Sequence, residues 1–353
     1  MHARWSIPFS FAAVGCCALP GGLQAPGAPG EVGRPPDALP PPGLRGALLD
    51  VVPRDGWAPP DVPAEGLYRI DLTDGARTRV GAAAPGVDED VVAVTAARGA
   101  AAVLVETSTT RLVRRFDAAG VPTDTPAPNP EPRVDTATWT AALLGDGSVG
   151  FTAALLDITN LHYRLRVRTP GKPELAPDLE FVISPVVAWA PDAVVVSRAG
   201  DAGGPVVDCA WRLPLDGGAP ERLWCFDRQG ATLGGITEMA MAPDGHHLAA
   251  VIGGAGEPGT LYVGDTPGEL ARVTFPTGAP VDPYSAHGGP RALAWAPDSA
   301  HLAVLADQDG PCWGDRLDRA CSDALYVVSA DGSGAARFGP YQPGGGVLAW
   351  GAE

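Results

Sequence analysis

One short segment occurs three times in this chain and constrains its fold more than any other feature. The copies each end in Ala-Pro-Asp, and they read VAWAPD at 187–192, MAMAPD at 239–244 and LAWAPD at 293–298. The last two continue into a second apolar run, at 248–252 and 302–305. Pro fixes φ and Asp hydrogen-bonds nearby backbone, so Pro-Asp after an apolar run predicts a turn between two strands.

The apolar residue before each turn, called the ruler residue below, allows the repeats to be counted. Its equivalents recur roughly every fifty residues, at Val94, Leu143, Trp189, Met241, Trp295 and Trp350. Later in each unit, an alternating strand such as 67–72 or 325–328 precedes a second turn that contains Gly. Period-2 alternation between such turns indicates antiparallel strands. A unit of this kind and period is typical of a β-propeller blade.

The two ends of the chain complement each other. Residues 350–353 resemble the start of a further unit, whereas residues 46–80 supply two or three strands without an opening strand. We therefore expect an all-β, six-bladed β-propeller over residues 45–353, closed by pairing of the C-terminal strand with the N-terminal blade. A seventh blade would need a strand within 120–140, and the five prolines there argue against one.

The first 44 residues have the composition of an export signal followed by a tether. Residues 1–16 start mildly positive and continue into a short, mostly apolar segment. Ala13-Val14-Gly15-Cys16 resembles a bacterial lipobox, although Leu is usual where Ala13 stands. This resemblance implies lipidation of Cys16; the alternative is ordinary secretion with a cleavage that discards it. Residues 17–44, rich in Pro, Gly and Ala, suit an extended spacer or a low-complexity leader.

We accordingly expect an exported protein, periplasmic or anchored to the outer membrane, whose membrane attachment is the lipid alone. The remaining cysteines fit an oxidising compartment. Cys209 and Cys225 flank the turn at 216–218 symmetrically, so a hairpin would place them opposite each other. Cys312 and Cys321 lie in one loop, and two local pairs in an exported chain predict two disulfides. The competing interpretation is a zinc site, but these cysteines have neither a CxxC spacing nor paired His nearby.

Charge and motifs narrow the function classes. Lys and Arg number 25 against 41 Asp and Glu, a net charge of −16 that repels nucleic-acid backbones. Cationic ligands or basic proteins fit better, although an acidic surface can serve solubility alone. No GxSxG, HExxH or GxxxxGK[ST] motif is present, and no GxGxxG lies at a strand-to-helix turn, so we predict no catalytic residue and no cofactor. His246-His247 is interpreted as a solvated turn, and the strand tryptophans as filling between blades.

The unit that begins at Trp295 contains roughly ten extra residues, and these map to a loop. Cys312 and Cys321 enclose this loop, and its candidate binding residues are Asp307, Asp309, Trp313, Asp315, Arg316, Asp318 and Arg319. The stretch from Asp307 to Gly310 partly resembles a calcium loop but lacks the third acidic position and the terminal Glu. Three interpretations stay open: a disulfide-pinned polar loop, a partner-binding loop and a weak calcium site at Asp307 and Asp309.

The Trp-Ala-Pro-Asp turns and the Leu-Tyr-Val-Val strand resemble TolB-type, WD-repeat-like propeller repeats, over 183–340 and weakly before 140. They are also similar to propeller domains of prolyl-oligopeptidase-type hydrolases. We expect neither the N-terminal α/β domain of TolB nor an attached hydrolase domain. Rigid repeats, a tether and missing catalytic motifs favour a monomeric scaffold that binds a protein or polymer partner. The alternatives are a polymer-acting lyase or hydrolase that uses loop carboxylates at the channel, and a structural domain with a calcium-stabilised loop.

Overall fold

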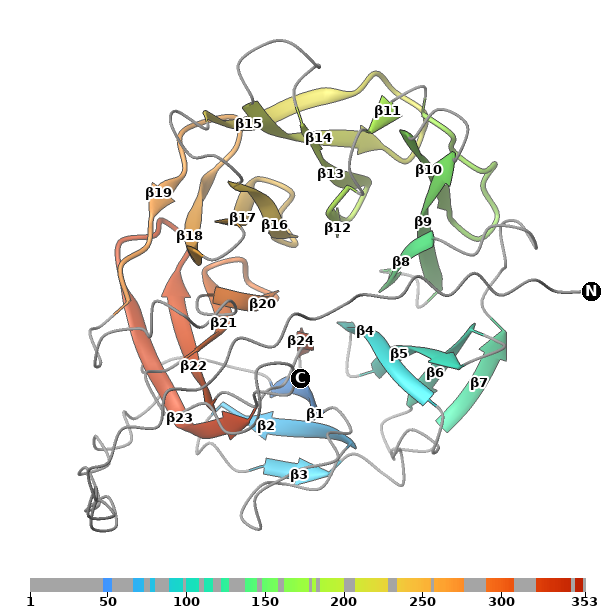
Figure 1. The fold of residues 1–353 in the computed structure, drawn as a ribbon. Coiled ribbons are helices and arrows are strands. Elements are labelled where there is room, and N and C mark those ends of the chain that lie inside the picture. Colours follow the sequence, from blue (N-terminus) through green and yellow to red (C-terminus); the bar gives the residue numbers. More distant parts are fainter. Residues whose placement is uncertain are drawn as a thin grey trace, which may run out of the picture. The chain divides into compact units, whose positions relative to one another are not determined.

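Every regular element that the computed structural model describes for this protein is a β-strand (Figure 1). The structure describes residues 47–52, 66–72, 77–79, 89–97, 100–107, 111–116, 122–126, 137–144, 148–157, 162–177, 180–181, 185–199, 207–227, 234–254, 257–275, 290–307, 322–343 and 347–351. All of these belong to one compact unit, Asp37–Glu353. None of them forms a helix long and apolar enough to cross a membrane.

The strands form six antiparallel sheets of four strands, numbered here in chain order. Sheet 1 contains β24 (Val347–Gly351), β1 (Ala47–Val52), β2 (Gly66–Asp71) and β3 (Arg77–Arg79). Sheet 2 contains β4 (Glu89–Ala97), β5 (Ala100–Thr107), β6 (Arg111–Phe116) and β7 (Pro122–Pro126). Sheet 3 contains β8 (Ala137–Leu143), β9 (Val149–Asp157), β10 (His162–Arg168) and β11 (Glu180–Phe181).

The second half of the chain repeats the same arrangement. Sheet 4 contains β12 (Val187–Trp189), β13 (Ala193–Ala199), β14 (Val207–Pro214) and β15 (Glu221–Asp227). Sheet 5 contains β16 (Gly234–Met241), β17 (His247–Gly254), β18 (Glu257–Asp265) and β19 (Ala271–Arg272). Sheet 6 contains β20 (Pro290–Trp295), β21 (His301–Asp307), β22 (Ser322–Ser329) and β23 (Ala335–Pro343).

The first strands of neighbouring sheets lie side by side. β20 borders β16 and β24, β4 borders β24 and β8, and β12 borders β16. All six ruler residues lie on these strands, namely Val94 on β4, Leu143 on β8, Trp189 on β12, Met241 on β16, Trp295 on β20 and Trp350 on β24. The all-β propeller fold predicted from the repeat is therefore confirmed.

The N-terminal and C-terminal strands share sheet 1. β24 pairs with β1 in an antiparallel register that places Leu48 opposite Trp350. Both side chains are buried, in a core that also contains Ala294 and Leu305 of sheet 6. Apolar side chains packed between sheets in this way provide most of the stabilisation of a propeller.

The expectation that residues 120–140 contain no strand is wrong. β7 spans Pro122–Pro126 and pairs with β6 as the outermost strand of sheet 2. Pro lacks a backbone N–H and is tolerated on an edge strand, where one side of the backbone needs no partner. The strand therefore completes sheet 2 and adds no seventh sheet.

The turns follow the chemistry expected from Asp and Gly. In four of them an Asp side chain accepts a hydrogen bond from the N–H two residues later, at 2.8–2.9 Å, and these are Asp216, Asp244, Asp298 and Asp331. Gly217, Gly245 and Gly332 adopt positive φ in three of these turns, a conformation that costs Gly little. In the fourth turn Ser299 takes the corresponding place with a φ of 60°.

Candidate functional site

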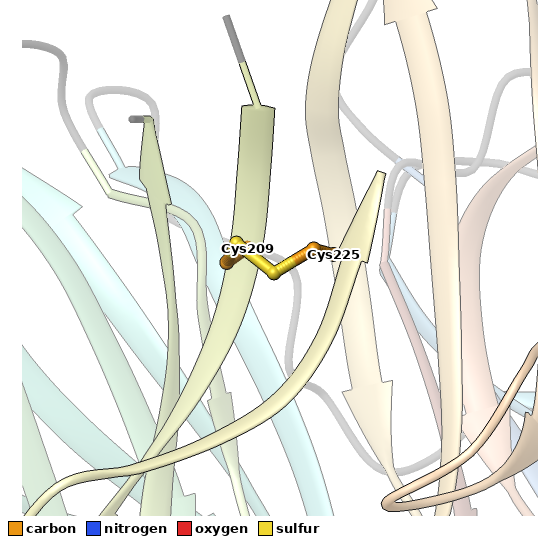
Figure 2. Close-up of a disulfide and its surroundings, with 2 residues drawn as sticks. All are labelled: Cys209 and Cys225. Atoms are coloured by element: carbon orange, nitrogen blue, oxygen red, sulfur yellow. A yellow bond between two sulfur atoms is a disulfide. The ribbon is translucent and has the colours of Figure 1, made fainter. Parts of the chain in front are cut away.

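The disulfide predicted between Cys209 and Cys225 is present. The two residues pair directly across β14 and β15, with 4.0 Å between their Cα atoms and 2.06 Å between their sulfur atoms. Figure 2 shows the bridge joining the two strands. It ties the outermost strand of sheet 4 to the strand inside it.

The other sequence candidates fall mostly outside the described residues. Cys16, Cys312 and Cys321 lie there, as does the loop from Asp309 to Arg319. Asp307 is the last residue of β21 and pairs with Asp323 of β22. Within the described ranges, no group of three or more His, Cys, Asp or Glu could hold a metal ion. The predicted binding loop and its weak calcium site therefore remain predictions.

The strand tryptophans connect neighbouring sheets, as expected. Trp295 is 6% exposed, and its indole N–H donates to the carbonyl of Ala240 on β16 at 2.9 Å. Trp189 donates in the same way to the Thr140 hydroxyl on β8 at 3.3 Å. Trp350 is buried between sheets 1 and 6. Trp295 and Trp350 thus lie in the core, and Trp189 packs against it.

A groove of about 500 Å³ opens between sheets 4 and 5 at the end where the Pro-Asp turns lie. Sheet 4 contributes one wall through Pro191, Asp192, Arg212, Glu221 and Leu223. Sheet 5 contributes the other through Pro243, Asp244, Gly245, His246, Thr266 and Pro267. Two copies of the repeated turn thus face each other across it, and we take this groove as the candidate functional site.

Arg212 is the one Arg or Lys among the residues that line the groove. Its Nη2 donates to both carboxylate oxygens of Asp192, at 2.8 and 2.7 Å, and its Nη1 lies 3.7 Å from Glu221 Oε2. The hydrogen bonds to Asp192 raise the pKa of the guanidinium above its ordinary value. The two residues come from the same hairpin, since Asp192 immediately precedes β13 and Arg212 lies on β14, which pairs with it. Asp192 is 67% exposed, so this pair orients Arg212 while adding little stability.

Asp244 organises the opposite wall. It accepts hydrogen bonds from the backbone N–H groups of His246 and His247, at 2.8 and 3.1 Å. The Nδ1 atom of His247 lies 2.6 Å from Asp244 Oδ2, and its Nε2 atom lies 3.3 Å from Asp265 Oδ1. Burial raises the pKa of the Asp244 carboxyl, but the hydrogen bonds from His246 and His247 outweigh it and lower the pKa below its ordinary value.

The expectation of a solvated His246-His247 turn is therefore half right. His246 is exposed and lines the groove. His247 is 27% exposed, and it contacts carboxylates with both ring nitrogens and packs against the Trp295 ring, with centroids 5.9 Å apart. It joins the β16–β17 turn to the end of β18. Its role is to hold the groove wall in place.

The groove offers carboxylates and no activated nucleophile. Thr266 is the single hydroxyl residue among those lining it, and that hydroxyl donates to the His246 carbonyl at 2.8 Å. Three lining carboxylates, Asp192, Glu221 and Asp244, face one guanidinium. Such a site can accept hydrogen bonds from a cationic group. Sequence reasoning identified the Pro-Asp turns but missed Arg212 and Glu221, which match no motif.

A smaller cavity of about 310 Å³ lies on sheet 3, lined by Val149, Phe151, Arg168, Thr169, Pro170, Lys172 and Glu174. Arg168 is hydrogen-bonded to Glu174, and Arg166 lies 3.7 Å from the same carboxylate. Arg166 and Arg168 thus share the single carboxylate of Glu174. We regard this cavity as the weaker candidate.

Comparison with known proteins identifies the fold. No family model and no curated protein match the sequence. TolB from Acinetobacter baumannii superposes with a TM-score of 0.55 at 14% identity, covering 87% of this chain and 67% of TolB. A protein assigned as TolB from Agrobacterium tumefaciens gives 0.50 at 12% identity, covering 86% of this chain and 91% of that one. A prolyl endopeptidase gives 0.50 at 10% identity, covering 85% of this chain and 50% of the enzyme.

The protein is therefore similar in fold to TolB-type and other β-propellers. It spans about half the length of the prolyl endopeptidase. At these identities the similarity extends to the fold alone.

Proposed function

We propose that this protein is an exported, lipid-anchored β-propeller that acts as a scaffold for a protein or polymer partner at the cell envelope. The observation that supports it best is the groove between sheets 4 and 5. Its walls are turns held by hydrogen bonds, its carboxylates outnumber its one guanidinium, and its hydroxyl is bonded to backbone. A surface of this kind is suited to binding a cationic group.

A scaffold needs a rigid frame, and the six sheets would provide it as the six blades of a closed ring. Pairing of β24 with β1 supports closure, as does the position of β24 beside both β20 and β4. Closure by a shared sheet leaves no free edge at the junction. Truncation before Val347 should then lower the unfolding midpoint well below that of the intact chain. A truncated chain that unfolds at the same midpoint would contradict closure.

The tether and the anchor would place this frame at the membrane surface. Cys16 would carry the lipid, and residues 17–44 would separate the propeller from the bilayer. The loop enclosed by Cys312 and Cys321 is a second candidate contact for the partner, with Trp313 and Arg316 among its residues and Asp307 on the strand before it. The Cys209–Cys225 bridge is consistent with an oxidising compartment.

Three measurements on protein made in a bacterial host test the proposal. The intact mass of the mature protein should equal that of a chain that begins at a lipid-modified Cys16 and contains two disulfides. Incubation with polysaccharide and peptide panels should give no turnover, and the same preparation should retain a partner from envelope extracts. Turnover that is lost when loop or groove Asp residues are changed to Asn would contradict the scaffold and favour a polymer-acting enzyme.

A further inference from the structure

We propose that β15, the outermost strand of sheet 4, is the docking edge for an extended, basic peptide segment of a partner protein. The segment would add a strand to the sheet and place one Lys or Arg side chain in the groove. This inference rests on the proposed scaffold function and names the class of partner and the site.

β15 is the longest described outer strand without a proline, and its pairing with β14 contains one β-bulge, at Leu223. It pairs with β14 on one side only, and it runs for seven residues, Glu221–Asp227, without a proline. β3, β11 and β19 have only two or three residues each. β7 and β23 contain prolines, which interrupt the donors that an incoming strand needs. The Cys209–Cys225 bridge fixes β15 to β14, so the edge is held ready for a partner strand.

An aromatic cluster lies along one end of this strand. Trp224 and Phe226 of β15 meet Tyr262 of β18, with ring centroids 5.7–6.2 Å apart. All three side chains are partly buried and pack against the core between sheets 4 and 5. Their partly exposed rings can take an apolar or aromatic side chain from the added strand.

The groove lies along the other end of the same strand, through Glu221 and Leu223. Its carboxylates are Asp192, Glu221 and Asp244, and Arg212 is the one guanidinium among its lining residues. This excess of negative charge matches the chain as a whole, whose net charge is −16. Charge complementarity therefore selects a basic segment over an acidic one.

The spacing between the two features sets the length of the segment. Glu221 and Phe226 lie five residues apart on β15, or roughly 17 Å at about 3.3 Å per strand residue. A partner segment of about six residues would thus reach from the groove to the aromatic cluster. Backbone hydrogen bonds along the edge would supply much of the affinity, and the two end side chains the specificity.

Synthetic peptides test this inference directly. The probes are Lys-Thr-Val-Thr-Val-Trp and its reverse, since an added strand can run in either direction. Each is compared with a version carrying Glu for Lys and with one N-methylated at alternate amides, by fluorescence anisotropy at low salt. One direction should bind the intact protein at least tenfold more tightly than either altered version. Equal binding of the Lys and Glu peptides, unchanged binding after N-methylation, or no binding by any peptide would overturn the proposal.

Variants distinguish this site from the scaffold function itself. Asp192→Asn combined with Glu221→Gln should remove most of the preference for Lys, whereas Asp298→Asn, in the equivalent turn of sheet 6 and not lining the groove, should leave it unchanged. If envelope extracts yield a partner that binds the groove double variant as tightly as the unaltered protein, the docking edge is wrong and the scaffold function stands. If they yield no partner, the scaffold function fails.

Discussion

The indole N–H of Trp295 donates a 2.9 Å hydrogen bond to the carbonyl oxygen of Ala240, which joins sheet 6 to sheet 5. Trp189 occupies the same place in its own repeat and donates to Thr140 of sheet 3 at 3.3 Å. The Trp of the repeated motif thus contributes both apolar area and a polar link to the preceding sheet. The contact joins residues about one repeat apart in the sequence.

Replacing Trp295 by Phe should destabilise the fold, because the smaller ring leaves the Ala240 carbonyl without its donor. We expect a loss of about 1–3 kcal/mol in the free energy of unfolding, measured by urea denaturation. Trp189→Phe is the matched variant and should cost less, since its hydrogen bond is longer and its side chain is only half-buried. Equal losses would contradict this difference between the two links.

Gly150 should not tolerate a side chain. A Cβ atom built there would lie 2.5 Å from the Trp189 ring, so Gly150→Ala should cost about 1–3 kcal/mol through overpacking. Gly171→Ala is a suitable control because a Cβ there meets nothing within 4 Å, although its φ of 73° should cost about 1 kcal/mol. Combining Gly150→Ala with Trp189→Leu should recover part of the loss in thermal denaturation. No recovery would show that the clash is not with Trp189.

Ser299 combines an unfavourable backbone with a useful hydroxyl. Its φ is 60°, and its Oγ accepts a 3.0 Å hydrogen bond from the backbone N–H of Asp244 in the neighbouring turn. Ser299→Ala removes the acceptor and keeps the strain, so it should cost about 1–2 kcal/mol. Ser299→Gly also loses the acceptor but relieves about 1 kcal/mol of backbone strain. The Gly variant should therefore be the more stable of the two, and the reverse order would contradict the link between the turns.

Asp244 should make stability depend on pH in the acid range. Its folded pKa lies below the ordinary 3.8, so its carboxylate stabilises the fold fully above that value and loses the effect as pH falls through the folded pKa. Asp244→Asn should thus cost at most about 1 kcal/mol at pH 7, since the side chain is 31% exposed, and less at pH 3. Urea titrations at both pH values check this, with Asp298→Asn as the control. A difference that grows towards low pH would contradict the assignment.

The regular parts of the fold could be predicted from the sequence because they depend on local chemistry. The six ruler residues predicted the first strand of each sheet, and symmetry about the 216–218 turn predicted the Cys209–Cys225 bridge. β7 was missed because prolines argue against a strand in general, whereas an outermost strand tolerates them.

The groove could not be predicted in the same way. Asp192 and Arg212 meet through the register of one hairpin, and Asp244 joins them from the next repeat. No single stretch of sequence contains the three residues. A site of this kind depends on how two sheets face each other, which the pattern of one repeat does not determine.

The central claim is that the protein binds a partner through the groove and does not act on it chemically. The most direct measurement is quantitative capture of envelope proteins by the intact chain, by its Asp192→Asn/Glu221→Gln variant and by the Asp298→Asn control. We predict one partner that the intact chain and the control retain equally and the groove variant loses at least tenfold, with no product formed from it. Equal retention by all three proteins, or a partner released in cleaved form, would contradict the claim.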